Sequence, residues 1–590
     1  MLKILEEVSS RHKKKINKIE KLKELRLPQD ALEALKSGNL TKEDRDYFLK
    51  CFGCFFKGSD YMIRVRISTL TPKKAFVLGE VAKKFGKDYI DLTTRAQVEL
   101  RFIEEKNLLK VIETLWENGI STYQTGVDNF RGILTDPMAG ISVSSIIDDN
   151  LLKAKLENEF LGKDLCVLPR KFNIGICGNI KNTSNVFTQD LGFALAKRDG
   201  EYGFRVFMGG RVGMIGRDSG VFVDVDEAVE LFRGVKELFK KYGFRDNRNK
   251  NRFAFLIKEV GIENFIKALE EYLSREFKRG GELLTSTKIN IHLEEELLNG
   301  KKAYKFIVPS GIFSGSDLIE AGRLAEKFGG EIRLSYDQNF YITNAKESIK
   351  ETKLYKKYSP NPYFNHLVAC AGTKTCSFAV IENKSDAINL AKKLSEFVPI
   401  NGIVKFHWSA CVKGCGIHGV GDFGFEGSKV KVDGVVKEGV NIYIGGNSMK
   451  EGKKVLSVPL DEVEKYILPM MKLYQGSNKT YEEWFRETEM SEWAAAFIMK
   501  FNAKYFEFLP SLPLKSKKIE YFEIKELGNK LFYQIAGVHA FDDLFRPLKV
   551  KSLKEFGFKG GIYNVVDGMV SGKYEVWSEV LDQLRMENGK

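Results

Sequence analysis

The sequence predicts an α+β fold built from two copies of one unit. Residues 81–103 (VAKKFGKDYIDLTTRAQVELRFI) are echoed by residues 324–345 (LAEKFGGEIRLSYDQNFYITNA), and in both segments a helix end precedes an alternating strand. The similarity continues downstream, where residues 189–210 match residues 421–446 at a spacing of about 235 residues. Because two such units bury their apolar faces by packing together, we expect them to be related by a pseudo-two-fold axis.

Length and charge restrict the class of protein. A chain of 590 residues exceeds what one hydrophobic core serves, so several domains are expected. The net charge of +14 would attract nucleic acid, an anionic membrane or an acidic protein. No long apolar stretch and no Lys/Arg run with interleaved aromatics occurs, which argues against a membrane and against nucleic acid. The charged N-terminal segment lacks a signal-peptide pattern, so we expect a cytoplasmic protein.

Four of the cysteines form a constellation. They follow the pattern C-x5-C and, after 34 residues, C-x3-C. Four thiolates can hold an iron–sulfur cluster or a zinc ion, but the first gap is wider than a zinc knuckle and favours the cluster. We expect the remaining cysteines to be packed in turns or in the core. The predicted ligands are Cys370, Cys376, Cys411 and Cys415; Cys51 and Cys54 are expected in a packed turn, and Cys166 and Cys177 in the core.

The two copies have become specialised. Sliding one onto the other places Cys177 opposite Cys411, so only the second copy supplies the full set of thiolates. The first copy supplies the cations Arg131, Arg170 and Lys171, which an anionic substrate or cofactor carboxylates would need. This division predicts one composite site between the copies.

Several segments together resemble one enzyme family. Besides the cysteine pattern, they are YMIRVRI (61–67), DLTTRAQVELR (91–101), DNFRGILTDPMAG (128–140), LPRKFN (168–173), NRNKNRFAFLIKEVGIENF (247–265) and GGN (445–447). Over about residues 40–480 the chain resembles the ferredoxin-type nitrite and sulfite reductases that contain siroheme and a [4Fe-4S] cluster. The resemblance implies a duplicated fold with ferredoxin-like half-domains and siroheme/Fe–S domains.

The resemblance and the repeats together divide the chain into six parts. We expect an N-terminal helical arm that wraps the core, two repeats of two domains each, and an aromatic-rich C-terminal appendage whose role the sequence does not indicate. The parts are the arm (1–55), the first ferredoxin-like half-domain (56–122), the first siroheme- and substrate-binding domain (123–300), the second half-domain (301–355), the Fe–S and siroheme-binding domain (356–480) and the appendage (481–590).

The resemblance also implies roles for individual residues. The four cysteines would hold the cluster, and Cys415 would also bridge to the siroheme iron. A basic cradle would bind the siroheme carboxylates, and four polar side chains would lie over the open face of the iron. The expected cradle is Arg95, Arg170, Arg211, Arg248, Arg252 and Asn447; the expected catalytic residues are Arg64, Arg131, Lys171 and Asn173.

The substrate prediction depends on the residues after LPR. Sulfite reductases of the family usually read Lys-x-Lys there, whereas this chain reads Lys171-Phe172-Asn173 as nitrite reductases do. A dianion such as sulfite gains more from a second ammonium group than nitrite does, so we expect the six-electron reduction of nitrite to ammonia. Reduction of sulfite to sulfide with the same cofactors is the alternative. Two departures from the family pattern, Ala96 and Lys413, leave substrate preference and redox tuning open.

The expected partners are an acidic electron donor such as ferredoxin and a small oxyanion, nitrite or sulfite. Donors of the ferredoxin type are usually acidic, and the basic chain would attract one. No GxGxxG fingerprint indicates a nicotinamide or flavin domain of its own. A more distant alternative is a binding module without turnover that holds an iron–sulfur cluster or zinc.

Overall fold

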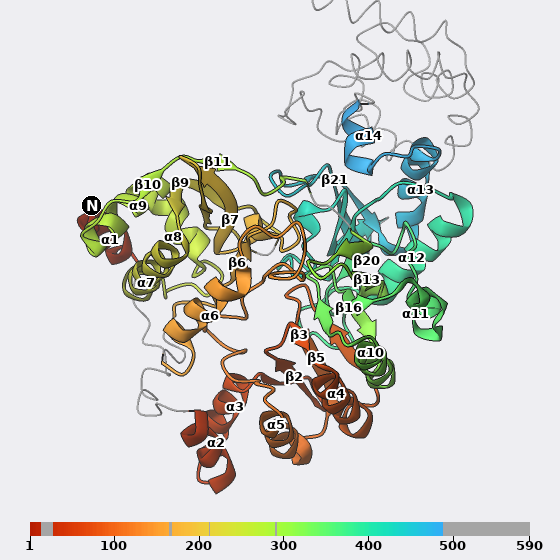
Figure 1. Cartoon of the computed structure of the whole chain (residues 1–590), viewed down its shortest axis with the longest axis horizontal. Helices are drawn as coiled ribbons and strands as arrows, with labels where there is room; N and C mark the ends of the chain where they lie inside the picture. The colour runs from red at the N-terminus through yellow and green to blue at the C-terminus, as the bar shows by residue number, and fades with distance from the viewer. Residues whose placement is uncertain (13–27, 164–167, 212, 289–291, 433, 488–590) are drawn as a thin grey trace, which may run out of the picture.

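The computed structural model describes residues 1–12, 28–163, 168–211, 213–288, 292–432 and 434–487 (Figure 1). In this part of the chain the strands form four sheets, and helices pack against them. The predicted α+β class is therefore confirmed. Four sheets arranged as two similar pairs also confirm the predicted duplication.

The first sheet belongs mostly to the N-terminal half of the chain. Its strand order is β1-β2-β5-β4-β14, and all of its neighbouring strands are antiparallel. Thr71 is the N-cap of helix α4, because its side chain accepts a hydrogen bond from the Lys74 N–H, and Pro72 occupies the first turn of this helix. The elements are β1 (Cys54–Phe56), β2 (Tyr61–Val65), β4 (Ile90–Leu92), β5 (Val98–Ile103) and β14 (Ile312–Phe313), with helices α4 (Pro72–Phe85) and α5 (Leu108–Glu117).

The second sheet repeats this arrangement later in the chain, with the order β12-β13-β16-β15-β3. Each sheet ends in a short strand from the other half of the chain. Strand β14 pairs with β4, and strand β3 pairs with β15. The elements are β3 (Thr69–Leu70), β12 (Glu294–Glu296), β13 (Lys302–Phe306), β15 (Ile332–Leu334) and β16 (Phe340–Ala345), with helices α10 (Gly315–Phe328) and α11 (Lys353–Lys357).

Helices α4 and α10 lie side by side, and each packs against the sheet of its own half-domain (Figure 1). Their backbones approach closely at Gly79, where an added Cβ would lie 2.6 Å from the carbonyl oxygen of Gly315. Only glycine at these positions permits this approach. One continuous hydrophobic cluster contains residues of both sheets and both helices, so the two half-domains share one core.

The third sheet follows the first half-domain in sequence. Its order is β10-β9-β8-β7-β11, and β6 pairs with β7 in parallel. Helices with a continuous apolar face pack on it and form a second core. The strands are β6 (Ile174–Cys177), β7 (Leu191–Arg198), β8 (Glu201–Met208), β9 (Arg217–Val223), β10 (Lys278–Arg279) and β11 (Glu282–Leu283), and the helices are α6 (Asp149–Phe160), α7 (Val225–Tyr242), α8 (Phe253–Val260) and α9 (Ile262–Leu273).

The fourth sheet is the counterpart of the third in the second half of the chain. Its order is β17-β18-β19-β20-β21, and β17, β18 and β19 are mutually parallel. It has its own hydrophobic core. The elements are β17 (Leu367–Ala369), β18 (Phe406–Ser409), β19 (Phe423–Val432), β20 (Val435–Ile444) and β21 (Lys453–Pro459), with helices α12 (Lys384–Phe397), α13 (Val463–Tyr474) and α14 (Tyr481–Glu487).

The N-terminal helices lie on two different parts of the molecule. Helix α1 (Leu2–Ser10) packs against α9, whereas α3 (Lys42–Cys51), preceded by α2 (Pro28–Ser37), contacts β1 of the first sheet. Residues 13–27 of the predicted arm and residues 488–590 of the predicted appendage lie outside the described residues, as does Cys166. In the described residues no helix has both the length and the apolar composition needed to cross a membrane.

Strand register corrects the alignment of the two copies at the cysteines. Strand β6 pairs with β7 as Ile174 to Leu191, and β18 pairs with β19 as Phe406 to Phe423. Phe406 therefore corresponds to Ile174, and Ser409 corresponds to Cys177. The alignment that set Cys177 opposite Cys411 was wrong by two residues, because the chain between β17 and β18 differs in length from its counterpart.

Candidate functional site

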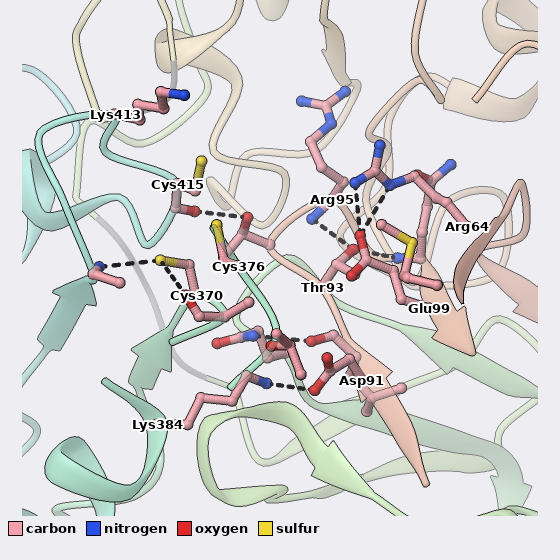
Figure 2. A pocket seen from close by; sticks show the side chains of 18 of the residues that line it. Arg64, Asp91, Thr93, Arg95, Glu99, Cys370, Cys376, Lys384, Lys413 and Cys415 are labelled. Atoms are coloured by element: carbon pink, nitrogen blue, oxygen red, sulfur yellow. Dashed lines mark hydrogen bonds and ion pairs between the residues drawn. The ribbon is translucent and has the colours of Figure 1, made fainter. Parts of the chain in front are cut away.

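A cavity of about 1150 Å³, including its open mouth, lies where the two halves of the molecule meet. Figure 2 shows cysteine side chains on one side of it and arginine side chains on the other. Among the described residues that line it are all four predicted cluster ligands and the four predicted catalytic residues: Cys370, Cys376, Cys411, Cys415, Arg64, Arg131, Lys171 and Asn173. The composite site expected between the copies is thus present as one space.

Two neighbouring parallel strands position the cysteines. Cys370 follows β17 directly, and Cys411 lies two residues after β18. The carboxyl ends of parallel strands meet at one edge of a sheet, so both loops start at the same place. The Cys370 backbone N–H donates to the carbonyl of Trp408 at 3.1 Å, and the Ala410 N–H donates to Cys370 Sγ at 3.2 Å.

The loop that carries Cys415 is held by contacts from both halves. Thr94 Oγ1 donates to the Cys415 carbonyl at 3.1 Å. Gly414 has a φ of 72°, a left-handed conformation that favours glycine. At Gly416 an added Cβ would lie 1.7 Å from the carbonyl oxygen of Trp408, so a side chain there would displace β18. The spacing C-x3-C with two glycines therefore has a local structural cause.

The electrostatics of the cysteines favour a metal cluster. Burial raises the pKa of the Cys370 thiol far above its ordinary value, and the neighbouring thiols of Cys415, Cys411 and Cys376 raise it further. Burial also raises the pKa of Cys411. Four thiolates that line one cavity stay deprotonated only beside compensating positive charge, which bound iron supplies.

The spacing of the cysteines along the sequence favours a cluster over a single ion. Across the described ranges, no three His, Cys, Asp or Glu side chains converge closely enough to ligate one metal ion. The four cysteines line one cavity, and their C-x5-C and C-x3-C spacing suits the four thiolate ligands of a [4Fe-4S] cluster better than the short knuckles of structural zinc.

Two arginines of the opposite wall have buried N–H groups that need an acceptor. Nε and Nη1 of Arg131 and Nε of Arg95 are inaccessible to solvent and have no hydrogen-bond acceptor in the described part of the chain. Burial lowers the pKa of Arg131 well below its ordinary value and that of Arg95 to about 9. An unsatisfied buried charged donor is costly, so an anionic group in this cavity would stabilise both side chains.

Lys171 and Asn173 lie directly before β6. The backbone N–H of Asn173 donates to Asp190 Oδ2 at 2.8 Å, which fixes the entry to the strand. Loss of solvent lowers the pKa of Lys171 to about 7; Cys415 opposes this shift, whereas Arg252, Arg131 and Arg170 reinforce it. Lys171 thus changes its charge near neutral pH.

The charges that line the cavity are mostly positive. Its described lining contains eight cationic side chains but only two carboxylates, Asp91 and Glu99. A cavity with this imbalance attracts anions and binds them more tightly than the exposed surface would. Siroheme, which carries many carboxylates, and a small oxyanion both fit this chemistry.

The other predicted cradle residues lie outside the described lining of the cavity. Arg170 and Arg248 both pair with Asp128, at 3.0 and 2.9 Å. Arg252 pairs with Asp190 at 2.5 Å, and Arg211 lies over the ring of Phe255. The amide of Asn447 donates to Glu482 at 3.2 Å. Arg95 is therefore the residue of the predicted cradle that lines the described part of the cavity.

Sequence reasoning missed several residues of the site. Gln338 donates to the carbonyl of Leu92 at 2.9 Å, and its Oε1 accepts from the Ala369 N–H at 2.7 Å, so it joins the two halves beside Cys370. Its φ of 65° matches the φ of 48° at Ala96, which is its counterpart in the repeat. The internal repeat was the signal that could have identified this turn.

The corrected register also identifies what replaces the cysteines in the first copy. Leu134 pairs with Gly175 as Val368 pairs with His407, so Asp136 corresponds to Cys370 and Asn179 to Cys411. Asn179 Nδ2 donates to Asp136 Oδ2 at 2.7 Å. The two counterparts therefore bind each other, and the first copy provides no thiolate pair for metal at this place.

Family models match both kinds of unit. The model described as nitrite and sulphite reductase 4Fe-4S domain matches residues 126–277. The model described as nitrite/sulfite reductase ferredoxin-like half domain matches residues 57–118 and 297–351. The ferredoxin-like half-domains predicted from the resemblance are therefore confirmed. The 4Fe-4S domain match falls on the first copy, whereas the four cysteines lie in the second.

Individual relatives agree with these matches. A ferredoxin–nitrite reductase of Synechococcus elongatus is 32% identical over 473 residues, which cover 73% of this chain and 90% of the relative. An assimilatory ferredoxin-dependent nitrite reductase of Haloferax mediterranei is 28% identical, covering 77% of this chain and 88% of the relative. The structure of the NirA protein of Mycobacterium tuberculosis has the same fold, with a TM-score of 0.73, 22% identity, and coverage of 80% of this chain and 97% of that one.

The similarities agree with the geometry of the site, in which the cysteine loops face arginines whose buried N–H groups have no acceptor in the described residues. The chain belongs to the family of nitrite and sulfite reductases that contain siroheme and a [4Fe-4S] cluster.

Proposed function

We propose that this protein catalyses the six-electron reduction of nitrite to ammonia, with electrons from an acidic donor of the ferredoxin type. The observation that carries the proposal is the single cavity in which four cysteines face Arg64, Arg131, Lys171 and Asn173. Relatives that are named ferredoxin–nitrite reductases support it. The six-part division of the chain given above belongs to the same proposal.

The cofactors would be held by both halves of the molecule. Cys370, Cys376, Cys411 and Cys415 would hold the cluster, and Cys415 would be the residue that links it to the siroheme. Arg95, with its orphaned Nε, would bind a siroheme carboxylate. When bound, the siroheme supplies the iron at which the substrate is reduced, and the cluster supplies its electrons.

The remaining cradle residues would act from behind the cavity wall. Arg170, Arg248 and Arg252 are paired with carboxylates and so arrange the wall around Lys171. We propose that they and Arg211 contribute positive potential toward the siroheme carboxylates. We also propose that Asn447, whose amide donates to Glu482, lies beside the bound siroheme.

The catalytic residues would bind nitrite and handle protons. The free N–H groups of Arg131 can donate to the nitrite oxygens. Lys171, with a pKa of about 7, can give a proton to an oxygen that leaves as water and take up another from solvent. Asn173 can donate a hydrogen bond without adding charge, which suits a monoanion.

The electron donor would meet the chain near the cluster. Beside Cys411, the side chains of Val412 and Phe378 are 78% and 62% exposed, and Lys413 lies over the Phe378 ring. Exposed apolar groups with a cation beside them suit an acidic protein partner. We therefore propose this rim as the place where electrons enter.

The test is anaerobic oxidation of a reduced viologen by the cofactor-loaded protein, with nitrite and sulfite compared at equal concentrations. Faster turnover with nitrite is expected because the cavity carries Asn173 in place of a second lysine. Faster turnover with sulfite would replace the proposal by sulfite reduction, and no turnover with either would favour a binding module.

A pair of cysteine variants provides the control. Cys376→Ser should lose the cluster absorbance and the turnover together, because a serine hydroxyl is a poor ligand for iron. Cys177→Ser should keep both, since Cys177 is a core residue of the first copy. Equal loss in the two variants would contradict the assignment of the ligands.

A further inference from the structure

A row of five alternating charges crosses the wall of the cavity from helix α12 to strand β2. Each neighbour in the row is in ion-pair contact with the next, and four of the five residues are labelled in Figure 2. The contacts are Lys384 Nζ to Asp91 Oδ1 (2.8 Å), Asp91 Oδ2 to Arg101 Nε (2.6 Å), Arg101 Nη2 to Glu99 Oε2 (2.6 Å) and Glu99 Oε1 to Arg64 Nη2 (2.7 Å).

The row ends at the proposed substrate site. Its inner members are nearly inaccessible to solvent, whereas the side chain of Arg64 is 26% exposed. Arg64 Nε and Nη2 donate to Glu99 Oε1, and Nη1 donates to the carbonyl of Thr125. An arginine has five N–H groups. Two of them therefore remain for a ligand, and Glu99 sets the direction in which they point.

Glu99 also sets the charge at this end of the row. Asp91 lies between Lys384 and Arg101, and Glu99 lies between Arg101 and Arg64, so two carboxylates offset part of three positive charges. Arg131 and Lys171, by contrast, have no ion-pair carboxylate in the described portion of the chain. Of the two carboxylates in the described lining of the cavity, Glu99 is the one that contacts a proposed catalytic cation, Arg64.

We propose that Glu99 is a specificity-determining residue, which partly neutralises Arg64 and so keeps the substrate end of the cavity suited to a monoanion rather than a dianion. The inference rests on the proposed function. Its physical basis is that the interaction of an anion with a nearby charge scales with the charge of the anion. One added unit of positive charge therefore favours sulfite, a dianion in mildly alkaline solution, over nitrite.

Glu99→Gln tests this directly. The glutamine side chain has nearly the same shape, and its oxygen can still accept from Arg64, but the negative charge is gone. The dissociation constant should fall for both anions, and the factor for sulfite should be about the square of the factor for nitrite. The ratio of kcat/KM for sulfite to that for nitrite should rise roughly three- to tenfold.

The two readouts separate this inference from the proposed function. Dissociation constants come from optical titration of the oxidised, cofactor-loaded protein with nitrite and with sulfite, and do not depend on turnover. If the unaltered protein reduced neither anion, the proposed function would fail, yet the titration would still decide the role of Glu99. Suppose that the unaltered protein reduced nitrite, and that Glu99→Gln changed neither the sulfite-to-nitrite ratio of dissociation constants nor that of kcat/KM. Only the inference about Glu99 would then be overturned.

Three further variants keep the test specific. Glu99→Asp retains the charge and should stay near the original ratio, even if the shorter side chain lowers stability. Asp91→Asn removes the other carboxylate of the row without touching Arg64 and should shift the ratio less than Glu99→Gln does. In an Arg64→Gln background, Glu99→Gln should add little; an undiminished shift there would show that Glu99 does not act through Arg64.

Discussion

At the scale of single residues, the site is defined by which charges have partners and which do not. Arg252 has a bidentate carboxylate partner in Asp190, whereas Arg131 has buried N–H groups without an acceptor. The paired arginine shapes the wall, and the unpaired one is free for an anion. Both arginines interact electrostatically with Lys171, whose pKa of about 7 makes its charge depend on pH in the working range.

Lys171 should therefore produce a pH dependence of catalysis. The lowered pKa means that the ammonium form is lost as the pH rises through about 7, or somewhat higher once bound anions raise the pKa. We expect kcat/KM for nitrite to fall on this alkaline side. Lys171→Gln should lower kcat/KM about a hundredfold or more at neutral pH, because it removes both the charge and the proton.

Lys171→Arg identifies the group that titrates. Arginine stays charged, so the alkaline decline should move to higher pH, whatever the effect on the maximum rate. Lys181→Arg is the matched control, because Lys181 pairs with Glu295 away from the cavity. The profile of kcat/KM against pH is the measurement. An alkaline decline that stayed in place in Lys171→Arg would assign it to another residue.

Residue types could be predicted from the sequence better than residue partners. The cysteines, Arg131 and Lys171 stand in segments whose letters indicate their chemistry. Glu99 and Gln338 do not, because their roles arise from contacts between strands that are distant in sequence. Likewise, the sequence could not distinguish Arg95, which lines the cavity, from Arg248, which pairs with Asp128.

At the scale of elements, helix α12 connects the cluster loops to the rest of the fourth sheet. Asn383 precedes its first turn with a φ of 61°, and its Nδ2 donates to the Cys370 carbonyl at 2.6 Å and to the Trp408 carbonyl at 3.2 Å. One amide thus joins the ends of β17 and β18. The next residue, Lys384, begins the row of charges that reaches Arg64.

Asn383→Ala should weaken retention of the cluster. It removes hydrogen bonds between buried groups, a loss of about 1–3 kcal/mol, and leaves the Cys370 carbonyl without this donor. We expect less iron per chain and a several-fold faster bleaching of the cluster absorbance in the presence of a chelator. Asn389→Ala, at an exposed position of the same helix, should behave like the unaltered protein. Equal bleaching rates in the unaltered protein, Asn383→Ala and Asn389→Ala would contradict the role of Asn383.

The internal repeat predicted the strands well, but it did not predict the register in which the two copies align. Alternation in residues 81–103 and 324–345 predicts the strands that became β4, β5, β15 and β16. The position of Cys177 against the second copy was wrong, because a loop that differs in length by two residues leaves no mark in the hydrophobic pattern. Pairing of β6 with β7 resolved it.

At the scale of the whole molecule, the two halves are held together by close packing as well as by exchanged strands. Gly79 on α4 and Gly315 on α10 each leave no space for a side chain, since a Cβ on either would lie about 2.5 Å from the other's carbonyl oxygen. The cavity lies between the same two halves. We therefore expect the width of the cavity to depend on this helix contact.

Gly79→Ala tests the dependence. Alanine favours a helix over glycine by about 1 kcal/mol, but here overpacking should cost about 1–3 kcal/mol and displace α10. We expect a lower thermal midpoint and a weaker dissociation constant for nitrite. Glu80→Ala raises helix propensity on the exposed face of α4 and should not lower the midpoint. A higher midpoint for Gly79→Ala would show that the helices can move apart without strain.

The exchange of β3 and β14 has a consequence for biosynthesis. The edge of β4 stays open until Phe313 has left the ribosome, and β15 then closes on Thr69 and Leu70, which were made long before. A nascent chain must therefore keep an unpaired strand edge soluble through more than a third of its translation, from Leu92 to Phe313. The cell has to protect this enzyme from aggregation before either cofactor can be inserted, and slow translation would prolong the exposure.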